Sequence, residues 1–397
     1  MERFELPVGW SWKALGDPSL TQINPKKSEV RNVPDALPIT FVPMDAISHE
    51  KGVIADPAIR KIGDVRKGYT YFAENDVIFA KITPCMENGK SAIAKYLSNG
   101  IGFGSTEFHV FRAKEGLLPE WLHCLLRSKQ LRNDAKKSMT GAAGQQRVPK
   151  DFLASYEVPV PPVYEQRRLT NRISSQIARV GLIRAQCEVL EKELRGILQG
   201  HYSRIIADAA WRPMGEVAPQ IRRPIAVMEG QSYAELGIRS FGKGSFHKPS
   251  LSPAEIGSKR IYSIEPGDLV FNNVFAWEGA VAVIKAKDAG RVGSHRFISC
   301  LPVQGVVTTP FLYFHFTTDQ GLHDLGDASP GGAGRNRTLG LKALDRIKVP
   351  VPSFHKQKIF SRLWETSEVI RGLQLDIKAD LAAYGPAILA KAFKGEL

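Results

Sequence analysis

The feature that most constrains the fold of this chain is an internal repeat. Val158-Pro-Val-Pro161 recurs as Val349-Pro-Val-Pro352, 191 residues further along. Four other matches keep the same order in both copies: Trp12…Leu15-Gly16 with Trp211…Met214-Gly215, Asn75-Asp76-Val-Ile-Phe79 with Gly267-Asp268-Leu-Val-Phe271, Gly104-Ser105-Thr-Glu-Phe108 with Gly293-Ser294-His-Arg-Phe297, and Gly141-Ala-Ala-Gly144-Gln-Gln-Arg147 with Gly331-Gly-Ala-Gly334-Arg-Asn-Arg337. Five matches in one order indicate a diverged duplication. We therefore expect two similar modules.

A long helix is predicted after the first Val-Pro-Val-Pro segment. Internal proline disappears there, and apolar residues recur every three or four positions, which is the period of one helix face. These positions are Leu169, Ile173, Ile177, Val180, Ile183, Cys187, Leu190, Leu194 and Ile197. They predict a helix of about 35 residues, about 50 Å long, that ends at Gly200.

The second copy repeats this apolar stripe. Its positions are Ile359, Leu363, Ile370, Leu373, Ile377, Leu381 and Tyr384. Gly385-Pro386 follow, and proline inside a helix removes a hydrogen bond and clashes with the preceding turn. We therefore expect the second helix to break or kink there and to be the shorter of the two.

The two stripes need a partner, since neither helix can bury its stripe alone. The simplest arrangement pairs the helices with each other as a coiled coil. If a pseudo-two-fold axis relates the two copies, the pair is antiparallel and the modules lie at opposite ends of a rod. We predict modules at residues 1–157 and 201–348, and long helices at 158–200 and 349–397.

Each module is predicted to be α+β, with short strands, glycine and proline turns and a few short helices. Residues 72–82 and 269–275 have the pattern of strands. Residues 119–129 have a helical period, and 310–318 occupy the same place in the second copy.

Composition narrows the class of partner. The formal net charge of +14 favours polyanions through counterion release and long-range attraction, although it could also serve only solubility. The sequence has no secretion signal and no apolar run near the roughly 18 residues of a membrane span, so we expect a cytoplasmic protein. The four cysteines lie far apart, which predicts no metal site.

Catalytic motifs are not evident. Methylation of a base requires Pro-Pro-aromatic after an acidic residue or Asn, and the nearest string, Pro161-Pro162-Val-Tyr164, fits the start of a helix better. The segment Gly237-Ile-Arg-Ser-Phe-Gly242-Lys243-Gly244 approaches a phosphate-binding loop, but Gly244 stands where that loop needs a hydroxyl. A chance match or a DNA-facing loop explains it better. We expect this chain to have no catalytic residues.

In this order the motifs resemble those of specificity subunits of type I restriction-modification enzymes. The residues that carry the resemblance are Trp12, Asp76, Gly104, Thr140-Gly141, Gln145, Pro159-Val-Pro-Pro162 and Glu165-Gln166. The final ten residues are similar to that family's usual C-terminal helix end, so the resemblance covers nearly the whole chain. The second copy departs from the pattern, with Lys356-Gln357 in place of Glu-Gln and Arg335 in place of Gln145.

The resemblance implies a non-catalytic subunit with two target recognition domains, each reading one half of a bipartite, asymmetric sequence in double-stranded DNA. The long helices would act as a ruler and dock two adenine methyltransferase subunits, and restriction subunits would join them for phage defence. S-adenosylmethionine, ATP and Mg would be bound by these partners, and no cofactor by this chain. It also implies docking roles for Glu165, Gln166, Arg167, Arg168 and Gln357. Glu165 could instead simply favour the helix dipole.

Glycine-rich loops with amide and basic side chains suit DNA contact. Glycine lets backbone N–H groups approach phosphate, while Arg and Gln donate to base edges. Our first candidates are Gln145, Gln146, Arg147, Arg335, Asn336 and Arg337, and the second group is Lys81, Asn88, Lys90, Asn272, Asn273, His295 and Arg296. These loops could instead cap the segment before Val-Pro-Val-Pro or face the methyltransferase, and the second group could be solvated surface. Trp277 is expected in the core rather than stacked on a base.

Two other functions stay open on the sequence. One is a stand-alone nucleic-acid-modifying enzyme such as a DNA methyltransferase with an unrecognised motif. The other is a two-domain scaffold that binds no DNA. Salt-dependent DNA affinity would exclude the scaffold.

Overall fold

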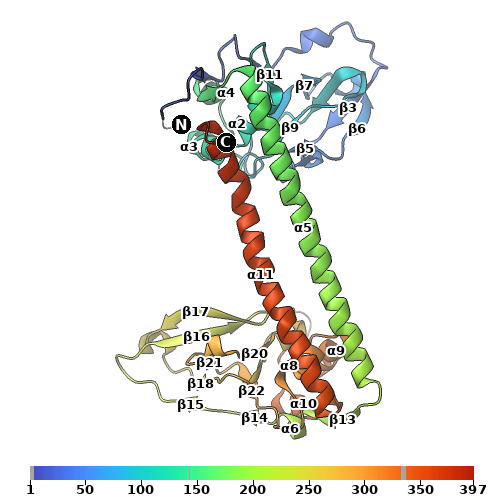
Figure 1. Cartoon of the computed structure of the whole chain (residues 1–397), viewed down its shortest axis with the longest axis vertical. Coiled ribbons are helices and arrows are strands. Elements are labelled where there is room, and N and C mark those ends of the chain that lie inside the picture. The colour runs from blue at the N-terminus through green and yellow to red at the C-terminus, as the bar shows by residue number, and fades with distance from the viewer. Residues whose placement is uncertain (1–3, 143, 332–336) are drawn as a thin grey trace. The chain divides into compact units, whose positions relative to one another are not determined.

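The chain divides into two compact units. The computed structural model describes residues 4–142, 144–331 and 337–397. Unit 1 comprises Met1–Ala185 with Ile377–Leu397, and unit 2 comprises Gln186–Asp376. Each unit therefore holds one globular module and a segment of each of two long helices, α5 (Val163–Ile206) and α11 (Phe354–Phe393), drawn in green and red in Figure 1.

The module of unit 1 contains two four-stranded sheets. Their strand orders are β6-β3-β10-β7 and β2-β11-β8-β9, and only β3 and β10 run parallel to each other. The strands of unit 1 are β1 (Ser11–Ala14), β2 (Thr21–Ile23), β3 (Pro38–Val42), β4 (Ile47–Ser48), β5 (Val53–Ile54), β6 (Ala58–Lys61), β7 (Thr70–Ala73), β8 (Val77–Ala80), β9 (Ser91–Ile93), β10 (Ile101–Gly104), β11 (Phe108–Ala113) and β12 (Glu157–Val160).

The module of unit 2 repeats this topology. Its sheets have the orders β14-β22-β19-β20 and β15-β18-β21-β16-β17, again with one parallel pair, β16 and β21. Its strands are β13 (Ala210–Pro213), β14 (Gln220–Ile221), β15 (Pro224–Ile225), β16 (Tyr233–Ile238), β17 (Ser245–Leu251), β18 (Ile261–Ser263), β19 (Leu269–Asn272), β20 (Val281–Val283), β21 (Val292–Ser294), β22 (Phe297–Cys300) and β23 (Lys348–Val351). The duplication predicted from the sequence is thus a duplication of fold.

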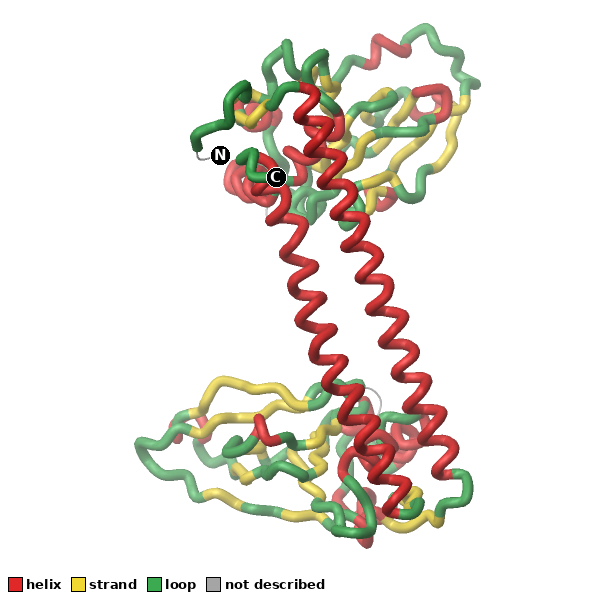
Figure 2. Tube along the Cα trace, in the orientation of Figure 1, coloured by secondary structure: helices red, strands yellow, loops and turns green. Residues whose placement is uncertain are grey.

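Short helices, drawn in red in Figure 2, complete each module. The α-helices are α1 (Ile62–Val65), α2 (Pro119–Arg127), α3 (Lys129–Ser138) and α4 (Lys150–Ser155) in unit 1, and α6 (Met214–Val217), α7 (Pro253–Ile256), α8 (Thr309–His315), α9 (Asp319–Asp327) and α10 (Leu341–Arg346) in unit 2. The 3-10 turns are η1 (Lys27–Val30), η2 (Met44–Ala46), η3 (Ser98–Gly100), η4 (Ala276–Glu278) and η5 (Ala286–Asp288). The predicted α+β class is confirmed for both modules.

Residues 72–82, expected as one strand, form the end of one strand and the whole of another. Between β7 and β8 the chain turns at Asn75, which has φ = 67°. The carboxylate of Asp76 accepts a hydrogen bond from the Ala73 amide and two from Arg112 on β11, at 2.7 and 2.8 Å. Asp268 of the second copy does the same with Glu265 and Arg223. Both aspartates are buried, so this repeated residue stabilises a turn and pairs a neighbouring arginine.

The Val-Pro-Val-Pro segments are strands of two-stranded sheets, where proline is tolerated because one edge needs no donor. β12 pairs with β1 so that Pro159 lies opposite Trp12. β23 pairs with β13 so that Pro350 lies opposite Trp211. The identical register explains why the tryptophan and the proline motif recur together in the sequence.

A buried glutamine joins each long helix to its module. The side chain of Gln166 accepts from the Leu118 amide and donates to the carbonyls of Gly116 and Pro161, each at 2.8 Å. Gln357 makes the equivalent three bonds at 2.7 to 3.0 Å, to Thr308, Val306 and Pro352. Both side chains have 0% exposure. Each glutamine thus fixes the first turn of its long helix to the loop that precedes α2 or α8.

The two long helices run antiparallel within each unit, as predicted. In unit 1 the Tyr384 hydroxyl donates to Gln176 and the Arg184 guanidinium to the Leu381 carbonyl, each at 3.2 Å. In unit 2 the Gln374 amide donates to the Cys187 carbonyl at 3.1 Å. Later residues of α5 therefore contact earlier residues of α11 in both units.

The predicted helix end at Gly200 was wrong, because α5 continues to Ile206. Pro386, where a break or kink was expected, does not break α11, which continues through it to Phe393. The helix ends enter the module cores: Leu198 and Tyr202 in unit 2, and Leu389 and Phe393 in unit 1. Burial of such side chains contributes about 1.5–3 kcal/mol each, enough to offset the cost of about 3 kcal/mol for an internal proline. The second helix is still the shorter, with 40 residues against 44.

The predicted apolar stripe coincides with the buried face of each helix only in part, although its members Leu169, Ile173 and Cys187 are buried. Its members Ile177, Ile183, Leu190, Ile197, Ile359, Leu373, Ile377 and Tyr384 are exposed. On α11 the buried side chains include Phe360, Trp364, Ser367 and Gln374, which were not in the predicted stripe. Two paired helices bury only a narrow seam, so apolar residues beside it stay in solvent. In the part of the chain that the structure describes, no helix is apolar enough over sufficient length to cross a membrane.

The glutamine joint predicts a loss of stability in Gln166→Leu. Leucine fills a similar volume but leaves the Leu118 amide and two carbonyls without partners, at a cost of about 1–3 kcal/mol for each unsatisfied group. We expect the thermal midpoint of unit 1 to fall by several degrees, measured by circular dichroism. Gln186→Leu, at an exposed helix position, is the matched control and should leave the midpoint unchanged. Equal thermal midpoints for the two variants would show that the hydrogen bonds of Gln166 do not stabilise unit 1.

A buried histidine predicts that the stability of unit 2 depends on pH. Burial lowers the pKa of His315 to about 4, and its Nδ1 lies 2.7 Å from the Tyr202 hydroxyl. Between about pH 6.5 and 4 the unfolded chain binds a proton that the folded chain does not, so stability falls as pH falls through this window. His315→Gln should flatten the slope by up to about 1.4 kcal/mol per pH unit.

Urea unfolding of unit 2 at pH 7.0, 6.0 and 5.0 measures this slope. His123 in unit 1 also has its pKa lowered to about 4 by burial, so signals from the two units must be followed separately. His355→Gln, at an exposed position of α11, should keep the wild-type slope. A wild-type slope in His315→Gln would show that His315 does not cause the pH dependence of unit 2 stability.

Candidate nucleic-acid interface

In unit 1 the loop after β8 and the glycine-rich loop 140–147 pack against each other. The backbone amide of Thr83 donates to the Gln146 carbonyl at 3.0 Å, and the Thr83 hydroxyl accepts from the Gln146 amide at 3.0 Å. Isolated β-bridges pair Arg147 with both Ile82 and Thr140. Lys81 and the three candidates Gln145, Gln146 and Arg147 are therefore brought together from distant parts of the sequence.

Arg147 is used within the protein. Its guanidinium makes two hydrogen bonds of 2.9 Å to the Glu107 carboxylate and one of 2.9 Å to the Gln145 carbonyl. These hydrogen bonds from Arg147 lower the pKa of Glu107. Arg147 therefore holds the loop in shape and leaves Gln145 exposed at its tip.

The remaining candidates of unit 1 differ in how free they are. Asn88 is exposed, whereas the Lys90 ammonium donates to the Met44 carbonyl at 2.8 Å. Lys81 lines a hollow of about 410 Å³ together with Lys27 and Tyr69. Asn88, Gln145 and Lys81 are thus the unit 1 candidates most available to a ligand.

In unit 2 the equivalent loops also meet. Asn272 ends β19 and Asn273 follows it. The Asn273 backbone accepts from the Leu339 amide and donates to the Arg296 carbonyl, each at 2.8 Å. His295 and Arg296 are exposed in the turn between β21 and β22. The structure therefore brings the predicted residues of this copy into one cluster.

Arg337 joins that cluster through Trp277. Its guanidinium carbon lies 5.6 Å from the centre of the Trp277 ring, and a β-bridge pairs Arg337 with Gly331. Trp277 is half-buried, with its indole N–H donated to the Val274 carbonyl at 3.1 Å, so it is not the core residue expected from the sequence. Arg335 and Asn336, which were also predicted to contact DNA, lie outside the described residues.

The residues expected to dock a partner differ in their exposure and in their contacts. Glu165 and Arg168 form an ion pair at 2.7 Å, and Arg168 also donates to the Leu397 carbonyl at 2.8 Å. Arg167 is exposed. Burial of Gln166 and Gln357 leaves neither side chain accessible, so the expectation that they contact a partner is not supported and their role is structural.

Sequence reasoning missed one further exposed residue of unit 2. Phe241, in the loop between β16 and β17, has 72% exposure. Its backbone amide donates to the Glu278 carbonyl at 2.7 Å, next to Trp277. The only signal in the sequence was the near match of this segment to a phosphate-binding loop.

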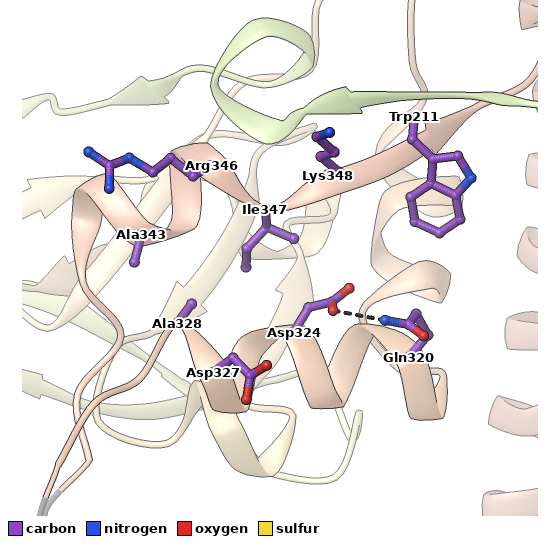
Figure 3. Close-up of a pocket in the computed structure, with 9 residues that line it drawn as sticks. All are labelled: Trp211, Gln320, Asp324, Asp327, Ala328, Ala343, Arg346, Ile347 and Lys348. Atoms are coloured by element: carbon purple, nitrogen blue, oxygen red, sulfur yellow. Dashed lines mark hydrogen bonds between the residues drawn. The ribbon is translucent and has the colours of Figure 1, made fainter.

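A groove elsewhere in unit 2 is lined by side chains of both charges. It has a volume of about 460 Å³ and is lined by Trp211, Asp324, Asp327, Lys348 and other residues shown in Figure 3. The carboxylates of Asp324 and Asp327 on α9 face it together with the cationic Arg346 and Lys348. At the matching place in unit 1 the Tyr156 hydroxyl donates to Asp134 at 2.9 Å. Among the described residues no cluster of three or more His, Cys, Asp or Glu could hold a metal ion.

Comparisons with known proteins agree with this architecture. Residues 24–192 match the sequence profile of the type I restriction modification DNA specificity domain. The type I restriction enzyme EcoEI specificity subunit of Escherichia coli is 39% identical over 199 residues, which are 50% of this chain and 32% of that protein. This chain thus spans about a third of the length of that curated relative.

Solved structures resemble the chain over its full length. A chain from a structure that concerns complex assembly and conformational transition of the type I R-M system has a TM-score of 0.68 at 21% identity and covers 100% of both chains. The HsdS subunit of Thermoanaerobacter tengcongensis has a TM-score of 0.59 at 21% identity, covering 100% of this chain and 99% of that one. At this identity the likeness concerns the fold. Residues 24–192 are therefore similar to the type I restriction modification DNA specificity domain, and the whole chain shares the fold of these solved subunits.

Proposed function

We propose that this chain is a DNA-recognition subunit in which each module reads one half of a bipartite, asymmetric target. The observation that carries the proposal is the pair of loop clusters at the same place in both modules. The scaffold is the same, but the exposed side chains differ: Asn88 and Gln145 in unit 1, His295 and Arg296 in unit 2. Loops on a rigid scaffold are the usual carriers of binding residues. Different side chains there predict different half-sites.

The chemistry of these side chains supports duplex DNA as the ligand. Asn and Gln can bond adenine bidentately, and Arg can bond guanine in the same way. The formal net charge of +14 supplies the salt-dependent attraction to phosphate on which DNA binding rests.

We also propose that the long helices dock methyltransferase subunits, to which restriction subunits add. Apolar side chains on the helices are exposed in both units, among them Leu182 with 66% exposure and Leu375 with 62%. Exposed apolar surface of this kind is typical of protein interfaces. S-adenosylmethionine, ATP and Mg would then belong to the partners, and this chain would contribute recognition and no catalytic group.

Selection from a random duplex library tests the reading of two half-sites. With a methyltransferase partner bound, the chain should select two defined blocks separated by a fixed number of unread base pairs. Asn88→Ala with Gln145→Ala should relax one block, and His295→Ala with Arg296→Ala the other, because each lost base contact costs about 1–3 kcal/mol of discrimination. Asn171→Ala, at an exposed position of α5, is the control. A single undivided block would contradict the proposal.

Methyl transfer separates this proposal from a stand-alone enzyme. The isolated chain, incubated with S-adenosylmethionine and DNA, should incorporate no methyl groups, whereas the complex with its partner should. Incorporation by the isolated chain would favour the enzyme.

A charge on the exposed helix surface should prevent docking. Leu182→Lys is expected to weaken methyltransferase binding at least about tenfold, since burying an unpaired ammonium costs several kcal/mol. The thermal midpoint of the free chain should not change. Gln186→Lys adds the same charge one turn later at an exposed polar position and controls for net charge. Wild-type affinity of Leu182→Lys, measured by calorimetry, would exclude this part of α5 from the interface.

A further inference from the structure

We propose that Phe241 is a wedge that inserts its ring between base pairs of bound DNA, in the half-site read by unit 2. This inference rests on the proposed DNA-recognition function and adds a mechanical role to it. Phe241 lies in the loop between β16 and β17. The sequence of this segment is a near match to a phosphate-binding loop.

The Phe241 ring is unusually free for an aromatic side chain. It has 72% exposure, whereas phenylalanine is among the residues most often fully buried. The described contact of its ring is with the Lys243 ammonium, 5.8 Å from the ring centre. An apolar ring exposed to solvent contributes little to the stability of the free chain. Burial of this ring against a ligand would therefore contribute to the binding free energy.

The backbone at Phe241 is strained. Its φ is 61°, a left-handed conformation that costs about 1–3 kcal/mol for a bulky residue. The surrounding structure holds it there. The Phe241 and Gly242 amides donate to the carbonyls of Glu278 and Gly279 at 2.7 and 3.0 Å, and the Tyr313 hydroxyl donates to the Gly242 carbonyl at 2.6 Å. Strain maintained by rigid partners is typical of functional positions.

Charge around the ring points to DNA rather than to a protein surface. Arg239, whose guanidinium lies 4.7 Å from the Phe246 ring, and Lys243 have no ion pair among the residues that the structure describes. The nearby Glu278 carboxylate accepts from the Ser240 hydroxyl at 3.0 Å. An exposed apolar ring with the Lys243 cation against it suits a base step flanked by phosphates, and wedge residues kink DNA by inserting apolar side chains at such steps. Glu278 belongs to the loop 276–279, which also contains Trp277 beneath Arg337. The proposed wedge therefore lies next to the predicted recognition cluster.

The other unit offers two instructive contrasts. The segment between β3 and β6, at the topological place of the Phe241 loop, contains no phenylalanine, tyrosine or tryptophan. Its exposed large apolar side chain is Val53, with 44% exposure, so unit 1 presents no aromatic wedge in this segment. Tyr96 shares exposure and strain, with 95% exposure and φ = 60°, but the Glu74 carboxylate accepts from its amide at 2.8 Å. Glu278 gives Phe241 an acidic neighbour as well, so what separates the two residues is position: Tyr96 lies in the loop between β9 and β10, which is not the counterpart of the Phe241 loop. We therefore expect base unstacking only in the half-site of unit 2.

Fluorescence of 2-aminopurine tests the wedge in the full chain bound to its methyltransferase partner. The duplex carries the selected target, with 2-aminopurine at one adenine position at a time in the unit 2 half-site. Wild-type protein should raise the fluorescence severalfold at the wedged step, because unstacking relieves quenching. Phe241→Gly should abolish this rise and weaken DNA affinity about tenfold, the range of one lost aromatic–base stack. Phe241→Trp should preserve the rise.

Stability gives an independent readout. Glycine accepts φ = 61° without strain, so Phe241→Gly should keep or raise the thermal midpoint of the free chain while it weakens DNA binding. Tyr96→Gly, which relieves the same strain in unit 1, should leave fluorescence and affinity unchanged.

The outcomes are distinguishable. If wild-type protein binds the target without a fluorescence rise, or Phe241→Gly binds and unstacks like wild type, the wedge is wrong and DNA recognition stands. If Phe241→Gly loses methyltransferase binding instead, Phe241 contacts a protein and the wedge is also wrong. If the wild-type complex binds no DNA, the proposed function itself fails.

Discussion

The structure depends on one buried side chain in each copy, the glutamine at the first turn of each long helix. Gln166 and Gln357 each satisfy one amide and two carbonyls of the adjoining chain. A glutamine in such a site is favourable only when all its bonds are made, because an unsatisfied buried polar group costs more than the bond contributes. The joint therefore fixes where each helix begins relative to the loop before α2 or α8. The other end of each long helix is held by packing in a hydrophobic core. Tyr202 of α5 packs in the core of unit 2, and Phe393 of α11 packs in the core of unit 1.

With the scaffold fixed in this way, the two copies are free to diverge in their loops. The buried pairs Asp76–Arg112 and Asp268–Arg223 are retained, and so is the register of tryptophan against proline. The exposed loops differ. Arg147 forms an ion pair with Glu107 in unit 1, whereas Arg337 stacks over Trp277 in unit 2. A common frame with different loops is what reading two different half-sites requires. Phe241 extends this asymmetry, since it combines a strained backbone with an exposed ring that the Lys243 ammonium contacts.

Exposed apolar residues on the long helices have the opposite meaning from the one that periodicity suggested. Spacing of three and four residues predicted a stripe that the helices would bury against each other. Within each unit the seam is narrower than the stripe, and side chains such as Phe360 and Trp364 occupy it while Ile359 and Leu373 remain in solvent. The period identifies a helix, but it does not identify which neighbour the face contacts. Surface left over in this way is available to another protein chain.

The sequence by itself determined the duplication, the α+β class, the two long helices and the cationic character, because these follow from local pattern and composition. It also pointed to the loops that cluster in each module, since the same glycine-rich segments recur in order. Only the tertiary structure decided where the helices end, because burial of Leu389 and Phe393 outweighs the local cost of Pro386. It also decided that Gln166 is buried and Phe241 exposed. Those outcomes depend on contacts between residues far apart in the chain, and local sequence carries no record of such contacts.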